Sequence, residues 1–354
     1  MISENLPAWA RRAPVLACAV LTLIAGLLGG WVRFGGPVDI PAHWMTWHGA
    51  LVAGLFFPTL IALERAVATG HAALWVAVGM LCAADLMAVI GGQMQPALGT
   101  AMLAMLLLLA VHLQLVWRFR ELHLVIMALA ALLAGSGHLH AYAAGHPLAG
   151  LAGWGGFLVL TIMAERIELS RVRRPAAPSL WLMGAFCTFM AAGLLTGARD
   201  GWSQMTVVLG AAGAWGWLWR WDLARLTWRK PGLPGYVGKN VLAGYAWLAV
   251  ALISAPYNRD LAIHGVMLGY VFTMVMGHAP VIFPAILRRR LRFSHAFYMP
   301  AGLLQTSLIL RAVADLGKPS LLLPSATLSL IAIVLLFVTT LRHLGPQPVP
   351  PPGG

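Results

Sequence analysis

Long apolar runs, separated by short polar turns, follow one another along almost the whole chain. A helix that crosses a bilayer needs roughly 20 mostly apolar residues, and most of these runs approach or reach that length. The pattern therefore predicts twelve membrane-spanning helices. They cover about residues 14–34, 43–64, 72–92, 97–117, 122–143, 147–165, 178–198, 202–221, 240–256, 260–287, 298–316 and 319–341.

The breaks between the runs carry glycine and proline, as in residues 35–37 and 145–147, and these residues favour turns. The longest polar stretch, about residues 222–239, is expected to form a basic linker between two helices. The tail 346–354 is rich in proline and glycine and is expected to be disordered. We therefore expect an all-α protein with a single integral membrane domain, residues 1–345, and no separate soluble domain.

The composition supports this class. Hydrophobic residues make up 60% of the chain, charged residues make up 10%, and the mean hydropathy is +0.80. A soluble domain is nearer half apolar and a quarter charged, so a disordered chain and an ordinary cytosolic enzyme are excluded. The three cysteines all lie in apolar runs and form no CxxC motif, which gives no basis for a disulfide framework.

The basic residues predict an orientation. The chain has a net charge of +13 and 24 lysines and arginines. If the N-terminus is cytoplasmic, nineteen of them fall on the cytoplasmic side, four fall on the other side, and Arg311 lies within a span. Cytoplasmic loops carry an excess of Lys and Arg, so we expect both termini to be cytoplasmic. The surplus of positive charge then needs no nucleic-acid partner.

Related short segments recur every four spans. His48-Gly49 near the start of span two corresponds to His264-Gly265 near the start of span ten, and Glu64-Arg65 in span two corresponds to Glu165-Arg166 in span six. A period of four helices predicts three arcs around a pseudo-threefold axis, unlike transporters of the major facilitator type, which repeat by six in units of three. The charged pairs are expected to form ion pairs with each other or with their neighbours.

His48 and His264 are expected to lie at similar depth near the outer face. Ionisable groups within spans are costly and mark functional sites. Neutral imidazole is a common metal ligand, and a haem can be held by a histidine on each face. The sequence therefore predicts that these two residues are the axial ligands of a haem b. The alternative is that each is a hydrogen-bonded packing residue.

Other histidines near the outer face could bind copper. His138, His140 and His146 surround the turn between spans five and six, and His43 precedes span two. Residues two apart on a regular helix do not face each other, so His138 and His140 could share an ion only at an irregular helix end. A hydrated polar loop is the alternative interpretation.

Further polar residues lie within expected spans. Asp85, in span three, has no partner close in sequence and is expected to line a polar cavity, and His112 and His278 fall in the inner third of spans four and ten. Arg311 and Asp315 are four residues apart, a spacing that places both on one helical face and predicts an ion pair.

Span ten resembles the NnrS family of haem- and copper-containing membrane proteins. His264, Gly269, Thr273 and Met274 follow that family's pattern His-x4-Gly-x3-Thr-Met. The match in span two is partial, because residues 52 and 55 are Val and Leu where the family has Met and Gly. The overall layout of spans resembles subunit I of the haem-copper oxidases.

The resemblance implies a haem protein of the bacterial inner membrane with a role in the response to nitric oxide, and copper as a further metal. The oxidases have a Tyr four residues after the first copper-binding histidine, but here Gly150 takes that position after His146, and span seven has no histidine. A proton-pumping oxygen reductase is therefore not expected. A transporter of a metal ion or small solute, and an oxidoreductase that exchanges electrons with quinone or nitric oxide, are the alternatives.

Overall fold

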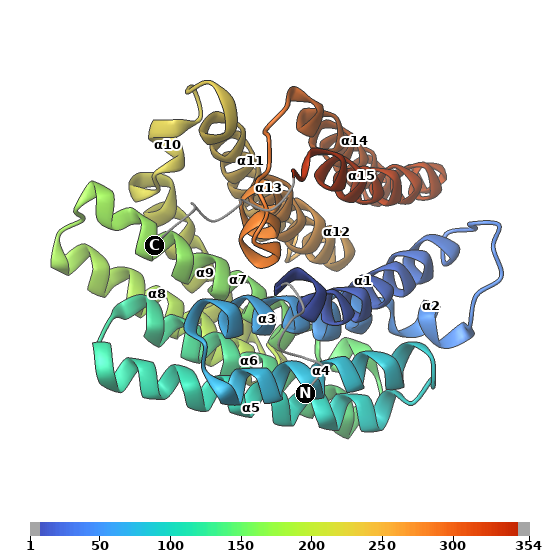
Figure 1. The fold of residues 1–354 in the computed structure, drawn as a ribbon, viewed down its shortest axis with the longest axis horizontal. Coiled ribbons are helices and arrows are strands. Elements are labelled where there is room, and N and C mark those ends of the chain that lie inside the picture. Colours follow the sequence, from blue (N-terminus) through green and yellow to red (C-terminus); the bar gives the residue numbers. More distant parts are fainter. Residues whose placement is uncertain (1–7, 346–354) are drawn as a thin grey trace, which may run out of the picture.

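The computed structural model describes residues 8–345, which are helical throughout apart from short loops and an isolated bridge (Figure 1). This confirms the all-α class. The tail 346–354 lies outside the described residues, and its predicted disorder stays a prediction. The α-helices are α1 (Ala8–Val32), α2 (Ala42–Gly49), α3 (Phe57–Thr69), α4 (Ala72–Val89), α5 (Met94–Phe119), α6 (Leu122–Ala144), α7 (Leu151–Ser170), α8 (Ala177–Leu195), α9 (Gly201–Trp221), α10 (Ala224–Thr227), α11 (Gly232–Ser254), α12 (Arg259–His264), α13 (Thr273–Leu287), α14 (Tyr298–Asp315) and α15 (Leu322–His343).

Two π-helical segments and four short 3-10 turns complete the described helices. The π-helices are η1 (Ala50–Phe56) and η4 (Gly265–Phe272), and the 3-10 turns are η2 (Pro147–Ala149), η3 (Arg171–Arg173), η5 (His295–Phe297) and η6 (Pro319–Leu321). η1 joins α2 to α3 in one continuous helix, and η4 joins α12 to α13 in another.

With these joins, the described residues contain a long helix for each of the twelve expected spans. Nine of the helices between residues 8 and 345 are long and apolar enough to cross a membrane; α7, α9 and α14 do not reach that standard. Large apolar side chains such as Trp117, Trp181 and Ile253 are exposed on the outside of the bundle. Exposed apolar surface of this kind suits contact with lipid, so the structure is that of a helical membrane bundle.

The linker after α9 is shorter than expected. The prediction that residues 222–239 form a loop is wrong, because α11 begins at Gly232 and the short helix α10 occupies part of the remainder. Pro234 and Lys239 lie inside α11. Proline is tolerated in the first turn of a helix, where its missing N–H has no intrahelical partner in any case.

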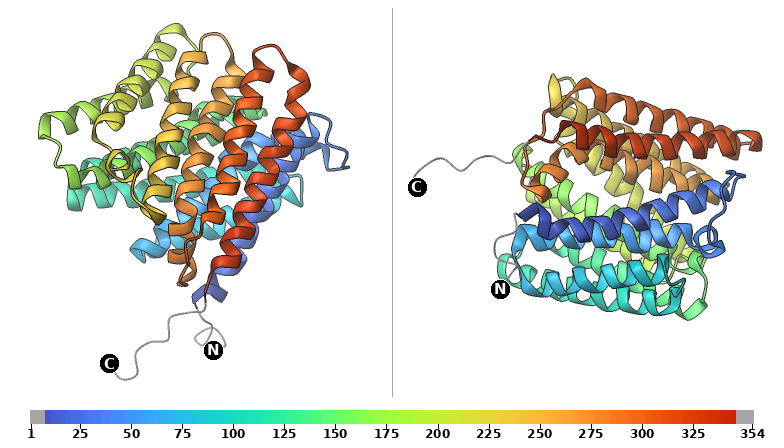
Figure 2. Two further views of the ribbon diagram at one scale, coloured as in Figure 1. Left: turned by 90° about the horizontal axis from the view of Figure 1, so that it is seen from above. Right: turned by 45° about the vertical axis from the view of Figure 1, so that its right-hand side comes forward.

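The first and last long helices lie side by side. α1 contacts α15 and α13, and α1 begins on the same side of the bundle on which α15 ends (Figure 2). The helices of the last third of the chain therefore pack directly against the first helix rather than only against their neighbours in sequence.

Three helices meet at the centre, and they are the three that carry the related sequence segments. α7 contacts both η1 and η4, and the rings of Phe57 and Phe272 lie 5.2 Å apart. The helix formed by residues 42–69 is 72% buried over its most apolar window, compared with 28% for residues 319–343. The sequence relation thus coincides with a central position in the fold.

Candidate functional site

His48 lies near the start of its long helix, against two glycines of α1. A Cβ at Gly29 would lie 2.1 Å from Trp44 O, and a Cβ at Gly30 would lie 3.5 Å from His48 Cδ2. The absence of side chains at these positions lets α1 approach the histidine closely. The His48 Nδ1–H donates to Met45 O at 3.0 Å. Nε2 therefore keeps its lone pair and makes no hydrogen bond that the described residues show.

His264 has the same arrangement on the second composite helix. Its Nδ1–H donates to Asp260 O at 2.8 Å, which again leaves Nε2 with a free lone pair. A metal-binding histidine usually donates its other ring N–H to a carbonyl or carboxylate, and both rings meet that requirement.

Charged groups surround this pair of histidines. Arg311 and Asp260 interact electrostatically with both rings, and Arg33 interacts with His48. Arg311 Nε donates to Asp315 Oδ2 at 2.8 Å, which confirms the predicted ion pair, and Arg311 Nη2 lies 3.5 Å from Asp260 Oδ2. The guanidinium also lies over the Phe34 ring at 5.1 Å. Two cations and two carboxylates thus lie around the histidines, and the formal charges of these four side chains balance.

A π-helical segment follows each of these histidines. η1 begins two residues after His48, and η4 begins one residue after His264. π-helical turns are rare and are frequent at functional sites. In both segments a tryptophan side chain from a neighbouring helix packs directly against a glycine. A Cβ at Gly54 would lie 2.8 Å from the Trp154 ring, and a Cβ at Gly269 would lie 2.5 Å from Trp247 Cβ. The sequence relation between spans two and ten therefore extends to backbone conformation and packing.

His112 and His278 are held in the same way as the pair. Their Nδ1 atoms donate to Leu108 O at 2.8 Å and to Met274 O at 2.7 Å. This bond therefore does not by itself distinguish His48 and His264 from other helical histidines. What distinguishes the pair is that the two free Nε2 atoms come from corresponding positions of the related segments, each just before a π-helical segment.

His138 is fully buried and is occupied by backbone groups. Its Nε2 lies 2.7 Å from Gly54 O, and its Nδ1 lies 2.7 Å from Ala134 O. Gly54 belongs to the π-helical segment η1, and the contact with its carbonyl joins α6 to that segment. Both carbonyl oxygens are acceptors and a neutral imidazole carries one N–H, so the ring donates to one of the two.

The other histidines proposed as copper ligands are dispersed. His43 lies beside the loop at Gly92. His140 is half-buried, and its Nδ1 has no partner among the described residues. His146 is exposed and accepts a hydrogen bond from Leu148 N at 3.2 Å. Within residues 8–345, no group of three or more His, Cys, Asp or Glu side chains is placed to hold a metal ion.

Asp85 is buried between α1, α3 and α4. Its Oδ2 accepts a hydrogen bond from Thr59 Oγ1 at 2.9 Å, and the Thr22 hydroxyl lies close to the carboxyl. Asp85 Oδ1 is buried and has no partner in the described part of the chain. The carboxyl is therefore incompletely satisfied, which is costly in an apolar interior.

A second polar cluster connects the central helices at their other end. Arg65 Nη2 donates to Glu165 Oε1 at 2.7 Å and to Glu64 Oε1 at 3.1 Å, which confirms the expected pairing of these residues. Sequence reasoning missed the buried pair next to it, in which Tyr245 donates to Asp222 Oδ2 at 2.7 Å. Asp222 is the only acidic residue between positions 200 and 260, and this isolation was the available signal.

A comparison with protein families matches residues 12–344 to a domain of unknown function, DUF8744. No curated protein and no solved structure matches the chain. The family match covers almost the entire described structure, including all the polar residues discussed above. The chain therefore belongs to the DUF8744 family.

Proposed function

We propose that this protein is an integral membrane protein that binds haem b, with His48 and His264 as the two axial ligands. The observation that carries the proposal is a pair of imidazoles at corresponding positions of two related central helices, whose Nδ1–H groups are held by backbone carbonyls and whose Nε2 atoms make no hydrogen bond that the described residues show. A haem iron bound on both faces needs one such nitrogen from each side. Arg33 is the cation that we assign to a haem propionate, because Arg311 is already paired with Asp315 and Asp260.

The proposal extends to the class of protein. The central position of the three related helices supports a pseudo-threefold arrangement like that of subunit I of the haem-copper oxidases, and the motif in span ten supports an NnrS-like protein. We propose that both termini are cytoplasmic, that the membrane is the bacterial inner membrane, and that the haem serves nitric oxide response or electron transfer. The distribution of basic residues supports the orientation.

A visible absorption spectrum tests the haem. The protein is expressed with sufficient haem, purified in detergent, and measured as a reduced-minus-oxidised difference spectrum. We expect the bands of a low-spin haem b. We expect His48→Ala and His264→Ala each to remove the low-spin signal, and His43→Ala, on the same helix as His48, to keep it. A correctly folded protein without haem bands contradicts the proposal, and a signal that survives both substitutions assigns the ligands elsewhere.

Copper binding by His43, His138, His140 and His146 stays a prediction. The dispersed positions of these residues and the contacts of His138 with two carbonyls give it no support. Metal analysis of the purified protein, alongside the His146→Ala variant, tests it. If these histidines bind the ion, we expect the purified protein to contain a stoichiometric amount of copper and the His146→Ala variant to contain less.

A transporter of a metal ion or small solute is a second candidate, favoured by Asp85. A buried carboxyl with an unsatisfied oxygen is a feature of ion and proton pathways within membranes. Uptake by proteoliposomes that contain haem-free protein, abolished by Asp85→Asn, would support transport. No uptake of protons or of metal ions by folded protein would exclude it for those substrates.

A further inference from the structure

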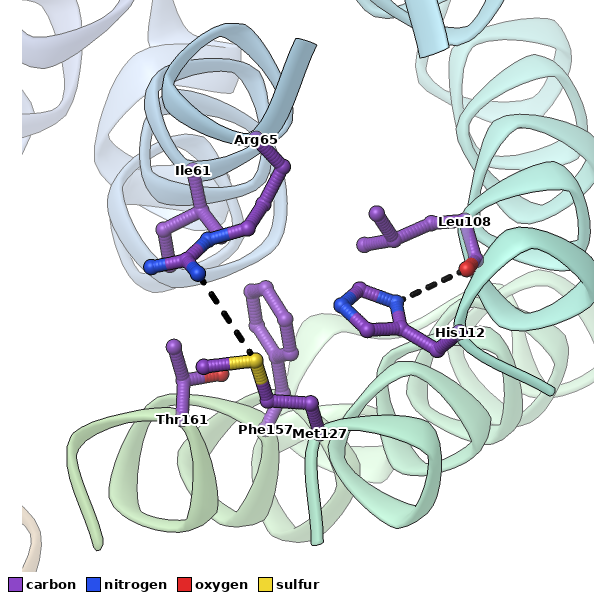
Figure 3. Close-up of a pocket in the computed structure, with 7 residues that line it drawn as sticks. All are labelled: Ile61, Arg65, Leu108, His112, Met127, Phe157 and Thr161. Atoms are coloured by element: carbon purple, nitrogen blue, oxygen red, sulfur yellow. Dashed lines mark hydrogen bonds between the residues drawn. The ribbon is translucent and has the colours of Figure 1, made fainter. Parts of the chain in front are cut away.

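A small polar cavity lies between α3, α5, α6 and α7, away from the two histidines of the proposed haem site (Figure 3). Its lining comprises Ile61, Arg65, Leu108, His112, Met127, Phe157 and Thr161. Its volume is about 10 Å3. That is about the minimum space that one water molecule needs.

Three polar atoms around this cavity have no hydrogen-bond partner among the described residues. Arg65 Nε is buried and unpaired, although the other nitrogens of its guanidinium contact Glu64, Glu165 and Met127. The His112 Nδ1–H is committed to Leu108 O, so Nε2 is a free acceptor that points across the cavity (Figure 3).

The Thr161 hydroxyl is the third of these atoms. Thr161 lines the same cavity from α7 and is buried. A hydroxyl can donate one hydrogen bond and accept others. The set therefore offers one N–H donor, one nitrogen acceptor and one group that can do either. A buried water typically makes about three hydrogen bonds to polar groups that are otherwise unsatisfied.

We propose that this cavity binds a single water molecule that accepts from Arg65 Nε and donates to His112 Nε2, with Thr161 Oγ1 as its third partner. Leaving the Nε–H of a guanidinium buried without a partner is costly, and one water satisfies it. The apolar members of the lining restrict the space, so a larger ligand does not fit. Met127 adds a sulfur atom, but Arg65 Nη1 lies 3.8 Å from it, and this positive charge disfavours a metal cation.

The water links His112 to a carboxylate one helical turn away. Thr161 and Glu165 are four residues apart on α7 and so lie on one face of that helix. Glu165 is half-buried and pairs with Arg65 at 2.7 Å. The proposed water and the Thr161 hydroxyl thereby connect His112 to the helix face that carries the Arg65–Glu165 pair. This inference does not depend on haem binding.

Solid-state NMR of the full chain in lipid bilayers, with 15N-labelled histidine, tests the site. The His112 signals are assigned by their loss in His112→Gln. We expect Nε2 to be an unprotonated, hydrogen-bonded nitrogen with a cross peak to water. We expect Thr161→Val to weaken or shift this cross peak, and Thr161→Ser, which keeps the hydroxyl, to retain it.

Folding of each variant is checked by circular dichroism and by the spectra of the other histidines. His278, held by an equivalent backbone bond, provides the internal reference and is expected to keep its signals in both Thr161 variants. A His112 Nε2 signal without any water contact in the unmodified chain overturns the proposal. So does a water contact that is identical in Thr161→Val and in the unmodified protein.

Discussion

Replacement of His138 by Phe should destabilise the bundle because it leaves Gly54 O without its partner. In the structure His138 Nε2 lies 2.7 Å from this carbonyl, which belongs to the π-helical segment η1. Phe keeps an aromatic ring at this position, opposite Trp154, whose ring centroid lies 5.6 Å away. Phe is larger than His, so overpacking adds to the loss of the hydrogen bond.

The expected cost follows from the burial of the carbonyl. Gly54 is buried and His138 is 0% exposed, so water does not replace the lost donor. A buried polar group left unsatisfied costs about 1–3 kcal/mol. We expect the free energy of unfolding of His138→Phe to fall by at least this amount. His140→Phe, two residues away and half-buried, is the matched control, and we expect it to change stability by less than about 0.5 kcal/mol.

The measurement is reversible unfolding in mixed detergent, followed by tryptophan fluorescence and circular dichroism. If His138→Phe and His140→Phe change the free energy of unfolding equally, within about 0.5 kcal/mol, the explanation of the Gly54–His138 contact is refuted.

Three further predictions concern other parts of the molecule. Gly153→Ala should lower the free energy of unfolding by about 1–3 kcal/mol, because the new Cβ would lie 2.5 Å from the α6 backbone. Gly155→Ala, where the Cβ would meet open space, should leave it unchanged. Equal unfolding midpoints for the two variants would contradict this prediction. Glu165→Gln, which breaks a bridge between two central helices, should lower the thermal midpoint more than Glu121→Gln, whose pair with an arginine is exposed, and the reverse order would be contrary evidence. The hydrogen bond from Ser203 N lowers the pKa of Asp200 in the folded chain. The ionised cap therefore stabilises α9 fully above the pKa that Asp200 has in the unfolded chain, and this stabilisation is lost as the pH falls through the folded pKa. Asp200→Asn should reduce that acid dependence in thermal unfolding measured across pH, and an unchanged profile would argue against the role of the cap.

The sequence predicted the helices well because the apolar runs are long and their breaks contain strong turn residues. It predicted the Arg311–Asp315 and Arg65–Glu165 contacts because helical spacing and the repeat placed these charges on common faces. It missed the π-helical segments. Where nearly every position is apolar, a change in the number of residues per turn does not alter the pattern of hydrophobic and polar positions. The sequence also offered His138 as a copper ligand or as part of a hydrated loop, whereas the structure buries this side chain completely.

The environment of His138 is determined by tertiary contacts. His138 is occupied by a carbonyl 84 positions away in the chain, and no local pattern contains that information. The same holds for Asp222, which Tyr245 and Arg166 reach from two different helices. Buried polar pairing depends on which helices become neighbours, and a single sequence specifies helix propensity more directly than helix neighbours.

The two π-helical segments affect how related sequences should be aligned. A π-turn accommodates about one more residue than an α-helix of the same length, since each N–H reaches back one position further. Deleting one residue between positions 50 and 56 would convert η1 to α-helix and rotate His48 by about 100° relative to Pro58. Family members with such a deletion would retain the histidine in an alignment, but its side chain would point in a different direction. The number of residues between the histidine and the proline, rather than the histidine alone, therefore distinguishes chains that share the proposed haem site.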